Sequence, residues 1–456
     1  MDENETRTPE FNRRDFLKGG STATLMTMLG GVELFAQTKE DSEIDLEDRG
    51  PKVKVAVIGL GTRGREILNT LARWPKAEIV AVCDTYPASV RRSASIAPGA
   101  VQTEDYRAIL NNRDILAVVV ATPTHQHKEI VLAALKAGKH VYCEAPLAHT
   151  IEDASAIALA AKAAPQLVFQ PGLHLRSELN RRELITTFRS GALGQPVMAR
   201  AQRHKKQSWR ASSPKPEREQ ELNWRLDKMI SLGLIGEVVS HQMDQARWFF
   251  NQLPVAVSGF GTIALWKDGR EVADTVRAVL EFPEGLSMTC DATLANSFDG
   301  EYEVYFGSDS AVLLRQGDIW LFKEVDSRLL GWEVYFPKEK FRDETGIVLK
   351  VGASKSVPLT EKEIQKDRLK KDPLYCALDA FLRNAQDVET AREEFVQEVG
   401  DDDPKALVEH LATKVKRRAT PGWLEGFQAA VTAIKANEAV LTGRRIILDP
   451  QWYQLG

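Results

Sequence analysis

A glycine-rich loop placed directly after a short β-branched run restricts the fold of this chain more than any other feature. The run is 53–58, and Gly59, Gly61 and Gly64 follow it in the spacing Gly-x-Gly-x-x-Gly, ahead of a helix-like segment at 65–73. In such a unit the first glycine permits a tight turn, the second lets a pyrophosphate approach the backbone, and the third allows close helix–strand packing. The amides of the helix N-terminus then face the phosphates. The sequence therefore predicts a dinucleotide-binding unit at this point.

The second predicted strand, 78–83, runs directly into Asp84. An acidic residue about 20 residues beyond the glycines is the usual partner of the adenosine ribose, and its charge repels a 2′-phosphate. The position of Asp84 therefore favours NAD over NADP. Arg91 and Arg92 lie near enough in the sequence to keep NADP open as an alternative.

Strand-like and helix-like segments continue to alternate up to residue 170. They lie at 115–121, 127–137, 140–143, 151–164 and 167–170. The alternation predicts an α/β fold with a doubly wound parallel sheet, in a Rossmann domain over 51–172. Because ligands bind at the carboxyl ends of such strands, residues that follow the glycines and the strand ends are expected to contact the cofactor. These residues are Thr62, Arg63, Thr122, Pro123, His127 and Glu144.

Length and composition limit the other classes of protein. The chain has 456 residues, more than one ordinary domain, and its 43% apolar and 27% charged residues are a globular balance. The net charge of −4 gives no sign of a nucleic-acid partner. Four scattered cysteines form no Cys-x-x-Cys pair, and His125 and His127 have no carboxylate nearby in sequence, so we expect buried free thiols and no metal site. The sequence has no run of about 18 apolar residues, so we expect no membrane span.

The N-terminal residues resemble an export signal followed by a linker. A twin-arginine pair, Arg13-Arg14, stands before an aromatic-Leu-Lys step and an uncharged run at 19–32. Paired arginines are common in proteins, but this arrangement at the extreme N-terminus favours export. We therefore expect a signal segment at 1–36, a polar linker at 37–50 and a periplasmic or other extracytoplasmic location.

Several motifs together resemble the glucose–fructose oxidoreductase, inositol dehydrogenase and rhizopine-catabolism (Gfo/Idh/MocA) family. They are the glycine loop, Asp84, Asp105-Tyr106-Arg107, the step from Thr122 to His127, and Gly138-Lys139-His140-Val141 ahead of Glu144-x-Pro146. The resemblance implies that 173–456 is a substrate-binding and oligomerisation α/β domain with a large open, mostly antiparallel sheet and a helical C-terminal extension. It also implies a small carbohydrate substrate, a sugar or cyclitol, and a homo-oligomer that pairs through the open sheet.

One position departs from the family pattern. Dehydrogenases of this family usually have Glu-Lys-Pro, in which the lysine helps to deprotonate or polarise the substrate hydroxyl. This chain has Glu144-Ala145-Pro146 instead. Because alanine exchanges no proton, another group must supply the base if the chain catalyses ordinary dehydrogenation.

The segment Glu237-x-x-x-His241 resembles the family's Asp-x-x-x-His motif. Residues four apart share a face of a helix, so both side chains can point into the cleft. An imidazole suits proton transfer to or from a sugar hydroxyl, and a neighbouring carboxylate would orient it. We therefore expect His241 as the general acid/base and Glu237 as its partner. The alternative is a buried helical pair with no part in catalysis.

A basic and aromatic segment, 204–224, follows a predicted strand of the second domain. Sugars present apolar C–H faces and many hydroxyls, which suit tryptophan platforms with Lys or Arg donors such as Arg225. An exposed loop without a ligand role is the alternative. Just past the last Rossmann strand, His174 is a further candidate. The residues expected to bind substrate are Arg176, His204, Lys206, Trp209, Trp224 and Asp244.

These features favour hydride transfer between NAD and a hydroxyl-bearing carbon of a sugar or cyclitol. A first alternative is an NAD-dependent glycosidase that oxidises its substrate transiently, eliminates the glycosidic substituent, adds water and reduces the product again. The NAD-dependent glycosidases of the same superfamily also lack the lysine of Glu-Lys-Pro. A second alternative is a non-catalytic NAD-dependent sugar binder.

Overall fold

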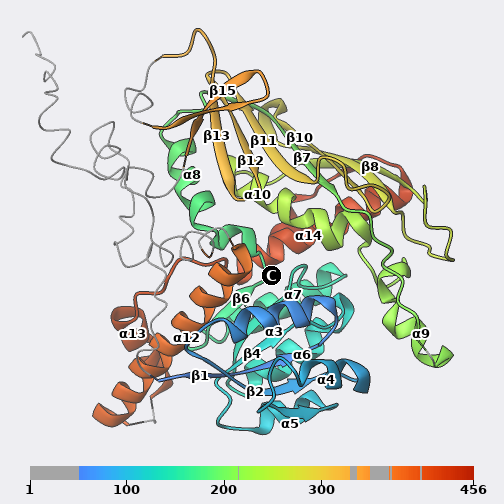
Figure 1. Cartoon of the computed structure of the whole chain (residues 1–456). Helices are drawn as coiled ribbons and strands as arrows, with labels where there is room; N and C mark the ends of the chain where they lie inside the picture. Colours follow the sequence, from blue (N-terminus) through green and yellow to red (C-terminus); the bar gives the residue numbers. More distant parts are fainter. Residues whose placement is uncertain are drawn as a thin grey trace, which may run out of the picture.

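The computed structural model describes residues 51–213, 215–328, 336–349, 369, 372–400 and 403–455. The signal segment expected at 1–36 and the linker expected at 37–50 lie outside the described residues. Figure 1 shows a smaller α/β domain below a large twisted sheet, with helices between them. Among the described helices, none is long and apolar enough to cross a membrane.

The smaller domain contains a sheet of six parallel strands in the order β3-β2-β1-β4-β5-β6. The strands are β1 Val53–Ile58, β2 Ala77–Cys83, β3 Val101–Thr103, β4 Ala117–Val120, β5 His140–Cys143 and β6 Phe169–Pro171. The helices between them are α3 Thr62–Ala72, α4 Pro87–Ser93, α5 Tyr106–Asn111, α6 His127–Lys136 and α7 Ile151–Lys162. The predicted Rossmann sheet is confirmed. The strand order reverses between β1 and β4, and this switch point is where such sheets bind ligands.

Two late helices, α12 Pro373–Glu398 and α13 Pro404–Lys414, pack against the Rossmann domain. The ring of Phe381 lies 5.8 Å from that of Tyr142, centroid to centroid. The indole of Trp74 donates a hydrogen bond of 2.6 Å to Asp379. One hydrophobic core therefore joins β1 and α3 to α12, although the sequence suggested α12 only as part of a helical extension of the second domain.

The second sheet has ten described strands in the order β14-β15-β13-β12-β11-β7-β10-β9-β8-β16. They are β7 Pro196–His204, β8 Ala256–Thr262, β9 Thr275–Glu281, β10 Ser287–Thr293, β11 Glu301–Gly307, β12 Ser310–Arg315, β13 Asp318–Lys323, β14 Lys338–Phe341, β15 Glu344–Val348 and β16 Ile446–Ile447. Neighbouring strands are antiparallel except for β7 and β10, which are parallel. The expected mostly antiparallel sheet is confirmed.

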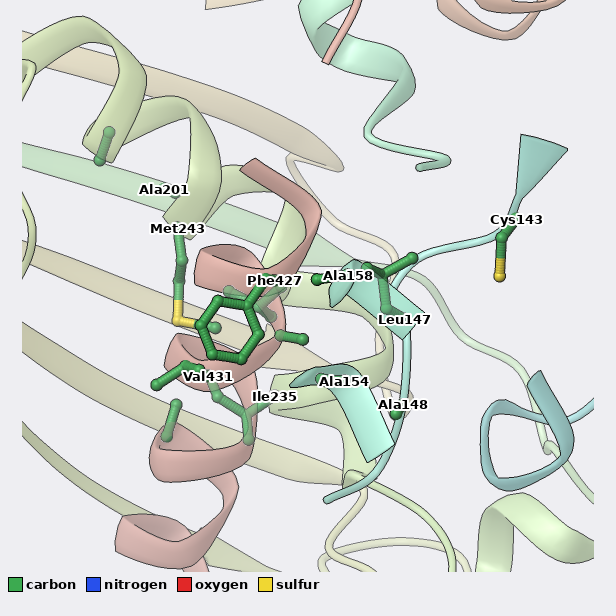
Figure 2. Close-up of a cluster of buried hydrophobic side chains, with 14 of the residues drawn as sticks. Cys143, Leu147, Ala148, Ala154, Ala158, Ala201, Ile235, Met243, Phe427 and Val431 are labelled. Atoms are coloured by element: carbon green, nitrogen blue, oxygen red, sulfur yellow. The ribbon is translucent and has the colours of Figure 1, made fainter. Parts of the chain in front are cut away.

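Helices α8 Leu179–Arg189, α10 Ser240–Phe250 and α14 Trp423–Thr442 belong to the second domain, and α9 Pro216–Leu222 stands apart on a long excursion after β7. Helix α14 lies between the two sheets and contacts α7, α10 and β8. Figure 2 shows Phe427 and Val431 of α14 near Met243 of α10, in the same buried cluster as Ala158 of α7. A side chain in place of Gly426 would come within 2.8 Å of Leu147, so α14 touches the Rossmann domain closely. This packing fixes the two domains against each other.

Candidate active site between the two domains

Two of the three glycines of the loop, Gly59 and Gly64, have the conformational roles that their spacing predicts. Gly59 has a φ of +94°, and a side chain there would lie 2.6 Å from the backbone of Ala121. A side chain at Gly64 would lie 1.8 Å from the Gly59 carbonyl oxygen, so α3 can approach β1 only with glycine at this position. A Cβ on Gly61 would meet nothing within 4 Å. This open backbone at the start of α3 fits the pyrophosphate of a dinucleotide.

Asp84 is held in place to receive a ribose. Its carboxylate accepts hydrogen bonds of 2.7 Å from the Leu60 and Tyr86 amides, one on each oxygen. Each oxygen keeps a lone pair for a ribose hydroxyl. Arg91 and Arg92 are exposed in the last turn of α4. The arrangement fits the NAD that the sequence favours.

An arm made of residues 205–213 and 215–223 reaches from the large sheet to the Rossmann domain (Figure 1). Arg218, on helix α9 of the arm, donates a hydrogen bond of 3.4 Å to the Thr85 hydroxyl. Its guanidinium also lies 5.3 Å from the ring centroid of Tyr86. These two residues directly follow the carboxylate placed for the ribose, so the arm contacts the adenosine side of the cofactor site. Sequence reasoning missed this contact, because 133 residues separate Arg218 from Thr85.

The residues after β4 line the switch point of the sheet. The Thr122 hydroxyl is buried and has no hydrogen-bond partner in the described part of the chain, which leaves it free for a ligand. Pro123 opens a short 3-10 turn, and Thr124 in that turn donates a hydrogen bond of 2.9 Å to Glu237 of the second domain. The end of β4 thus connects the two domains.

His127 was expected to bind the cofactor, but the structure gives it a supporting position. It is 1% exposed, and its ring nitrogens lie 3.0 to 3.3 Å from the carbonyl oxygens of Thr122, Pro146 and Leu147. Burial lowers the pKa of His127 to about 4. The residue therefore lies between the ends of β4 and β5, where one ring nitrogen can donate a hydrogen bond, and it shapes the site from behind.

Glu144, at the end of β5, is engaged by the glycine loop. Arg63 donates hydrogen bonds of 3.0 and 3.3 Å to its two carboxylate oxygens. The same guanidinium pairs with Glu66 at 2.9 Å and lies 3.4 Å from Nδ1 of His174. Arg63 therefore links the cofactor loop to residues of the domain junction.

His241 lies beside His174, with ring centroids 4.5 Å apart. Burial and the nearby charges of Arg63 and Arg203 lower the pKa of His241 to about 3, and Asp244 offsets only part of this shift. Its Nδ1 is buried and has no hydrogen-bond partner among the described residues. Burial, with His241 and Arg63, also lowers the pKa of His174. Two neutral imidazoles thus meet at the domain junction. The sequence indicated His174 only as a further candidate, and the structure places it directly beside His241.

Glu237 does not orient His241 as the spacing suggested. Its carboxylate accepts hydrogen bonds of 2.9 Å from the Thr124 hydroxyl and 3.1 Å from the Leu232 amide. Glu237 lies in a π-helical turn, Ile235–Val239, whose wider winding does not follow α-helical spacing. Burial raises the pKa of Glu237, and Arg225 offsets part of this shift. Its position supports a role in joining the domains.

Arg176 and Asp244, expected to bind substrate, bind each other. Their bonds are 2.6 and 2.8 Å long, and the Asp244 side chain is 1% exposed. Arg247 donates two further bonds to the same carboxylate. Because the Asp244 side chain is buried between two arginines, the structure places it as an anchor of the helix that carries His241.

The basic and aromatic segment divides into two parts. His204 is held by Asp291 at 2.6 Å and by the Phe298 carbonyl, and Lys206 is exposed. Trp209 is partly buried and packs against the hydrophobic cluster that both domains share. Trp224 is buried at the domain junction, with its ring 5.9 Å from that of His125. Trp224 is therefore the member of this segment that the structure brings nearest to the residues after β4.

Arg225 follows Trp224. The sequence indicated it only as an example of a Lys or Arg donor to a sugar. Its guanidinium lies 4.5 Å from the Trp224 ring centroid and 6.0 Å from that of Trp209. Burial lowers the pKa of Arg225, and the charges of Glu237 and Glu144 offset only part of that shift. Within the described ranges it forms no hydrogen bond or ion pair with a side chain or backbone oxygen. No group of three His, Cys, Asp or Glu side chains among those residues is arranged to hold a metal ion.

Comparison with known families agrees with this geometry. Residues 53–171 match the model of an oxidoreductase family with an NAD-binding Rossmann fold, and residues 182–311 match the Gfo/Idh/MocA C-terminal domain. The chain belongs to the Gfo/Idh/MocA oxidoreductase family. The resemblance inferred from the motifs is confirmed, and so is the NAD-binding domain.

Several curated Gfo/Idh/MocA proteins are similar to this chain. A 1,5-anhydro-D-fructose reductase of Ensifer adhaerens is 29% identical over 265 residues, which are 57% of this chain and 74% of that protein. A levoglucosan dehydrogenase of Pseudarthrobacter phenanthrenivorans is 29% identical over 42% of this chain and 52% of its own length. An inositol 2-dehydrogenase of Saccharopolyspora erythraea is 38% identical over 32% of this chain and 44% of its own length. The matches to the last two thus span about half of those relatives.

Several solved structures share the fold of this chain. A levoglucosan dehydrogenase in complex with NADH and L-sorbose superposes with a TM-score of 0.63 at 19% identity, covering 88% of this chain and 100% of that one. An oxidoreductase domain protein from Kribbella flavida gives the same TM-score at 18% identity, with 88% and 100% coverage.

Within this Gfo/Idh/MocA site, Ala145 occupies the position after Glu144, and the Ala145–Pro146 peptide bond is cis. The two buried imidazoles of His174 and His241 lie next to Arg63, which binds Glu144.

Proposed function

We propose that this protein is an NAD-dependent oxidoreductase that acts on a hydroxyl-bearing carbon of a sugar or cyclitol, with His241 as the general base. NAD, when bound, accepts the hydride or returns it. The observation that carries the proposal is the free, buried Nδ1 of His241 beside His174. A neutral imidazole can take a proton from a hydroxyl without first losing one of its own. Relatives that act on anhydrofructose, levoglucosan and inositol support the substrate class.

The charged residues around His241 determine how strongly its imidazole holds a proton. Arg63 and Arg203 oppose a charge on the imidazole, whereas Asp244 favours it. A proton taken by His241 is therefore held weakly and is easily passed on, and His174 at 4.5 Å between centroids is the neighbouring ring. Glu144 holds Arg63 in this position by two hydrogen bonds. These chain residues replace the lysine that Ala145 removes.

The test is turnover by the purified full chain. Substrates are sugars, cyclitols and aryl glycosides, each assayed with and without added NAD. We expect NADH to form with at least one sugar or cyclitol, and His241→Asn to abolish that activity while leaving bound dinucleotide unchanged. If NAD binds but every substrate class fails, the proposal is wrong, and sugar binding without turnover would support the non-catalytic binder.

A second candidate function is the recycling glycosidase. Two observations favour it: the alanine at position 145, and the arm that Arg218 holds against Thr85 and Tyr86. A covered cofactor that stays bound suits a reaction in which the hydride taken from a substrate molecule is given back to that same molecule. Release of an aryl glycoside's phenol without net NADH would support this function, whereas stoichiometric NADH would support the dehydrogenase.

We also propose that the protein is exported by the twin-arginine route and forms a homo-oligomer. The support for export is the Arg13-Arg14 motif in the sequence. The support for an oligomer is the large sheet's outer face, where Phe260 is 63% exposed and Ile447 of the edge strand β16 is 70% exposed. A fusion of residues 1–36 to a folded reporter tests export, with both arginines changed to lysine as the control. Light scattering of wild type and Phe260→Lys tests the oligomer.

A further inference from the structure

Arg225 is a cation at the domain junction that forms no ion pair or hydrogen bond with the other described residues. Its guanidinium stacks on Trp224, with 4.5 Å from its central carbon to the ring centroid. Trp224 is buried, so one face of the guanidinium is covered by an aromatic ring that offers no acceptor for its N–H groups. Its five donors remain available.

The other arginines around this site are committed to carboxylates. Arg63 binds Glu144 at 3.0 Å, Arg176 binds Asp244 at 2.6 Å, and Arg203 pairs with Glu301. For Arg225, neither an ion pair nor a hydrogen bond to the described residues exists. Arg225 is partly exposed, and its nitrogen atoms are not among the fully buried ones, so an anionic ligand can reach them and pair with the charge.

The turn that carries Arg225 is fixed before any ligand arrives. Asn223 is buried, and its side-chain amide donates hydrogen bonds of 2.8 Å to the carbonyl oxygens of Ala211 and Glu219. Its side-chain oxygen accepts a bond of 2.7 Å from the Ala211 amide. With Trp224 anchored beside it, Arg225 is held in one place at little further entropic cost on binding.

Contacts of Trp224 and Arg225 place them near the residues that follow β4 and β5. Trp224 lies 5.9 Å from the ring of His125, in the turn that follows β4. Glu237 and Glu144 are the charges close enough to act on Arg225. Arg225 therefore lies on the same side of the domain junction as the cofactor strand ends.

We propose that Arg225 binds a carboxylate of the substrate, so that the protein's substrate class is a uronic acid or its glycoside. The inference rests on the proposed function and adds the charge of the substrate to it. A carboxylate matches the planar guanidinium with two parallel hydrogen bonds. A phosphomonoester carries a charge of about −1.5 to −2, and the two nearby carboxylates would repel it more strongly than a single carboxylate.

The experiment is calorimetric titration of the full chain loaded with NAD. The probes are D-glucuronate and D-galacturonate, each paired with its neutral counterpart, D-glucose and D-galactose. The variants are Arg225→Met, which keeps the packing stem, and Arg225→Lys, which keeps the charge but not the fork. Lys228→Met is the matched control, because Lys228 is three residues away and forms an exposed ion pair with Glu271 at 3.3 Å.

We expect one uronate to bind wild type at least tenfold more tightly than its neutral counterpart. Arg225→Met should weaken the uronate by roughly 10- to 100-fold and the neutral sugar by less than threefold, as for a lost charged hydrogen bond. Arg225→Lys should recover part of the loss, and Lys228→Met should behave as wild type. Equal affinity for charged and neutral sugars, or an equal loss for both in Arg225→Met, would overturn the proposal.

The failure of the proposed function has a different signature. If uronate binds through Arg225 but no substrate is turned over, the catalytic assignment fails and the charge assignment stands. If neutral sugars are oxidised and uronates do not bind, the reverse holds.

Discussion

The imidazole rings of His174 and His241 meet edge to face, with centroids 4.5 Å apart and planes inclined by 62°. One ring comes from the turn after the last Rossmann strand and the other from helix α10, so the pair exists only when both domains are in place. Burial keeps both rings neutral by lowering their pKa values.

The first prediction concerns this pair. His241→Asn should lower kcat by about 10²- to 10⁴-fold, the range expected for loss of a general base. His174→Asn should lower kcat less, because it does not remove the free Nδ1 of His241. Steady-state kinetics test this with the bound dinucleotide quantified in each variant. Similar losses in both variants with full dinucleotide would instead show that the two rings act as one unit.

The second prediction concerns the arm over the cofactor site. Arg218→Ala removes the hydrogen bond to Thr85 and the stacking on Tyr86. NAD should then dissociate roughly 5- to 30-fold faster, since such contacts contribute about 1–2 kcal/mol. Stopped-flow fluorescence of bound NADH measures the rate. Lys54→Ala is the control, because its surface ion pair with Asp114 involves the opposite end of β1. An unchanged rate in Arg218→Ala would mean that the arm does not retain the cofactor.

The third prediction concerns the buried pair of Arg176 and Asp244. Asp244→Asn should reduce the free energy of unfolding by about 3–5 kcal/mol, because it leaves two buried guanidinium groups without their anion. It should also lower the pKa of His241 further, since Asp244 is the charge that raises it. Urea unfolding gives the first value. Asp299→Asn, in a partly exposed pair with Arg315, should cost less than about 1 kcal/mol.

The fourth prediction concerns stability against acid. Burial, with Arg417 and Arg392, lowers the pKa of His140 from 6.5 to about 3. Below pH 6.5 the unfolded chain takes up a proton at this residue that the folded chain refuses, so stability falls as the pH falls from 6.5 towards 3. Between pH 7 and pH 5 the loss is about 2 kcal/mol. His140→Asn keeps an acceptor for the Val168 amide and removes the titration. Its unfolding free energy should change less over that range, and parallel curves for the two proteins would contradict the assignment.

The sequence predicts those features of this protein that are formed by residues close together in the chain. The glycine loop and Asp84 are recognisable because a turn, a helix N-terminus and a ribose carboxylate occupy a short stretch of chain. Spacing failed for Glu237, because a π-helical turn changes the winding and Thr124, 113 residues earlier, supplies its hydrogen bond. The sequence also offered no sign that Asp244 pairs with Arg176, which is 68 residues away. Contacts between distant segments decide which polar side chains remain free, and no periodicity in the sequence encodes them.

Helix α12 closes one face of the Rossmann sheet with residues that lie about two hundred positions after the last strand of that sheet. During synthesis the first half of the chain therefore leaves the ribosome with an apolar surface that it cannot cover by itself. We expect a fragment that ends near residue 172 to be insoluble. The dinucleotide site should become stably folded only after α12 has been synthesised. We therefore expect stable cofactor binding to require the segment that carries α12 as well as the glycine loop.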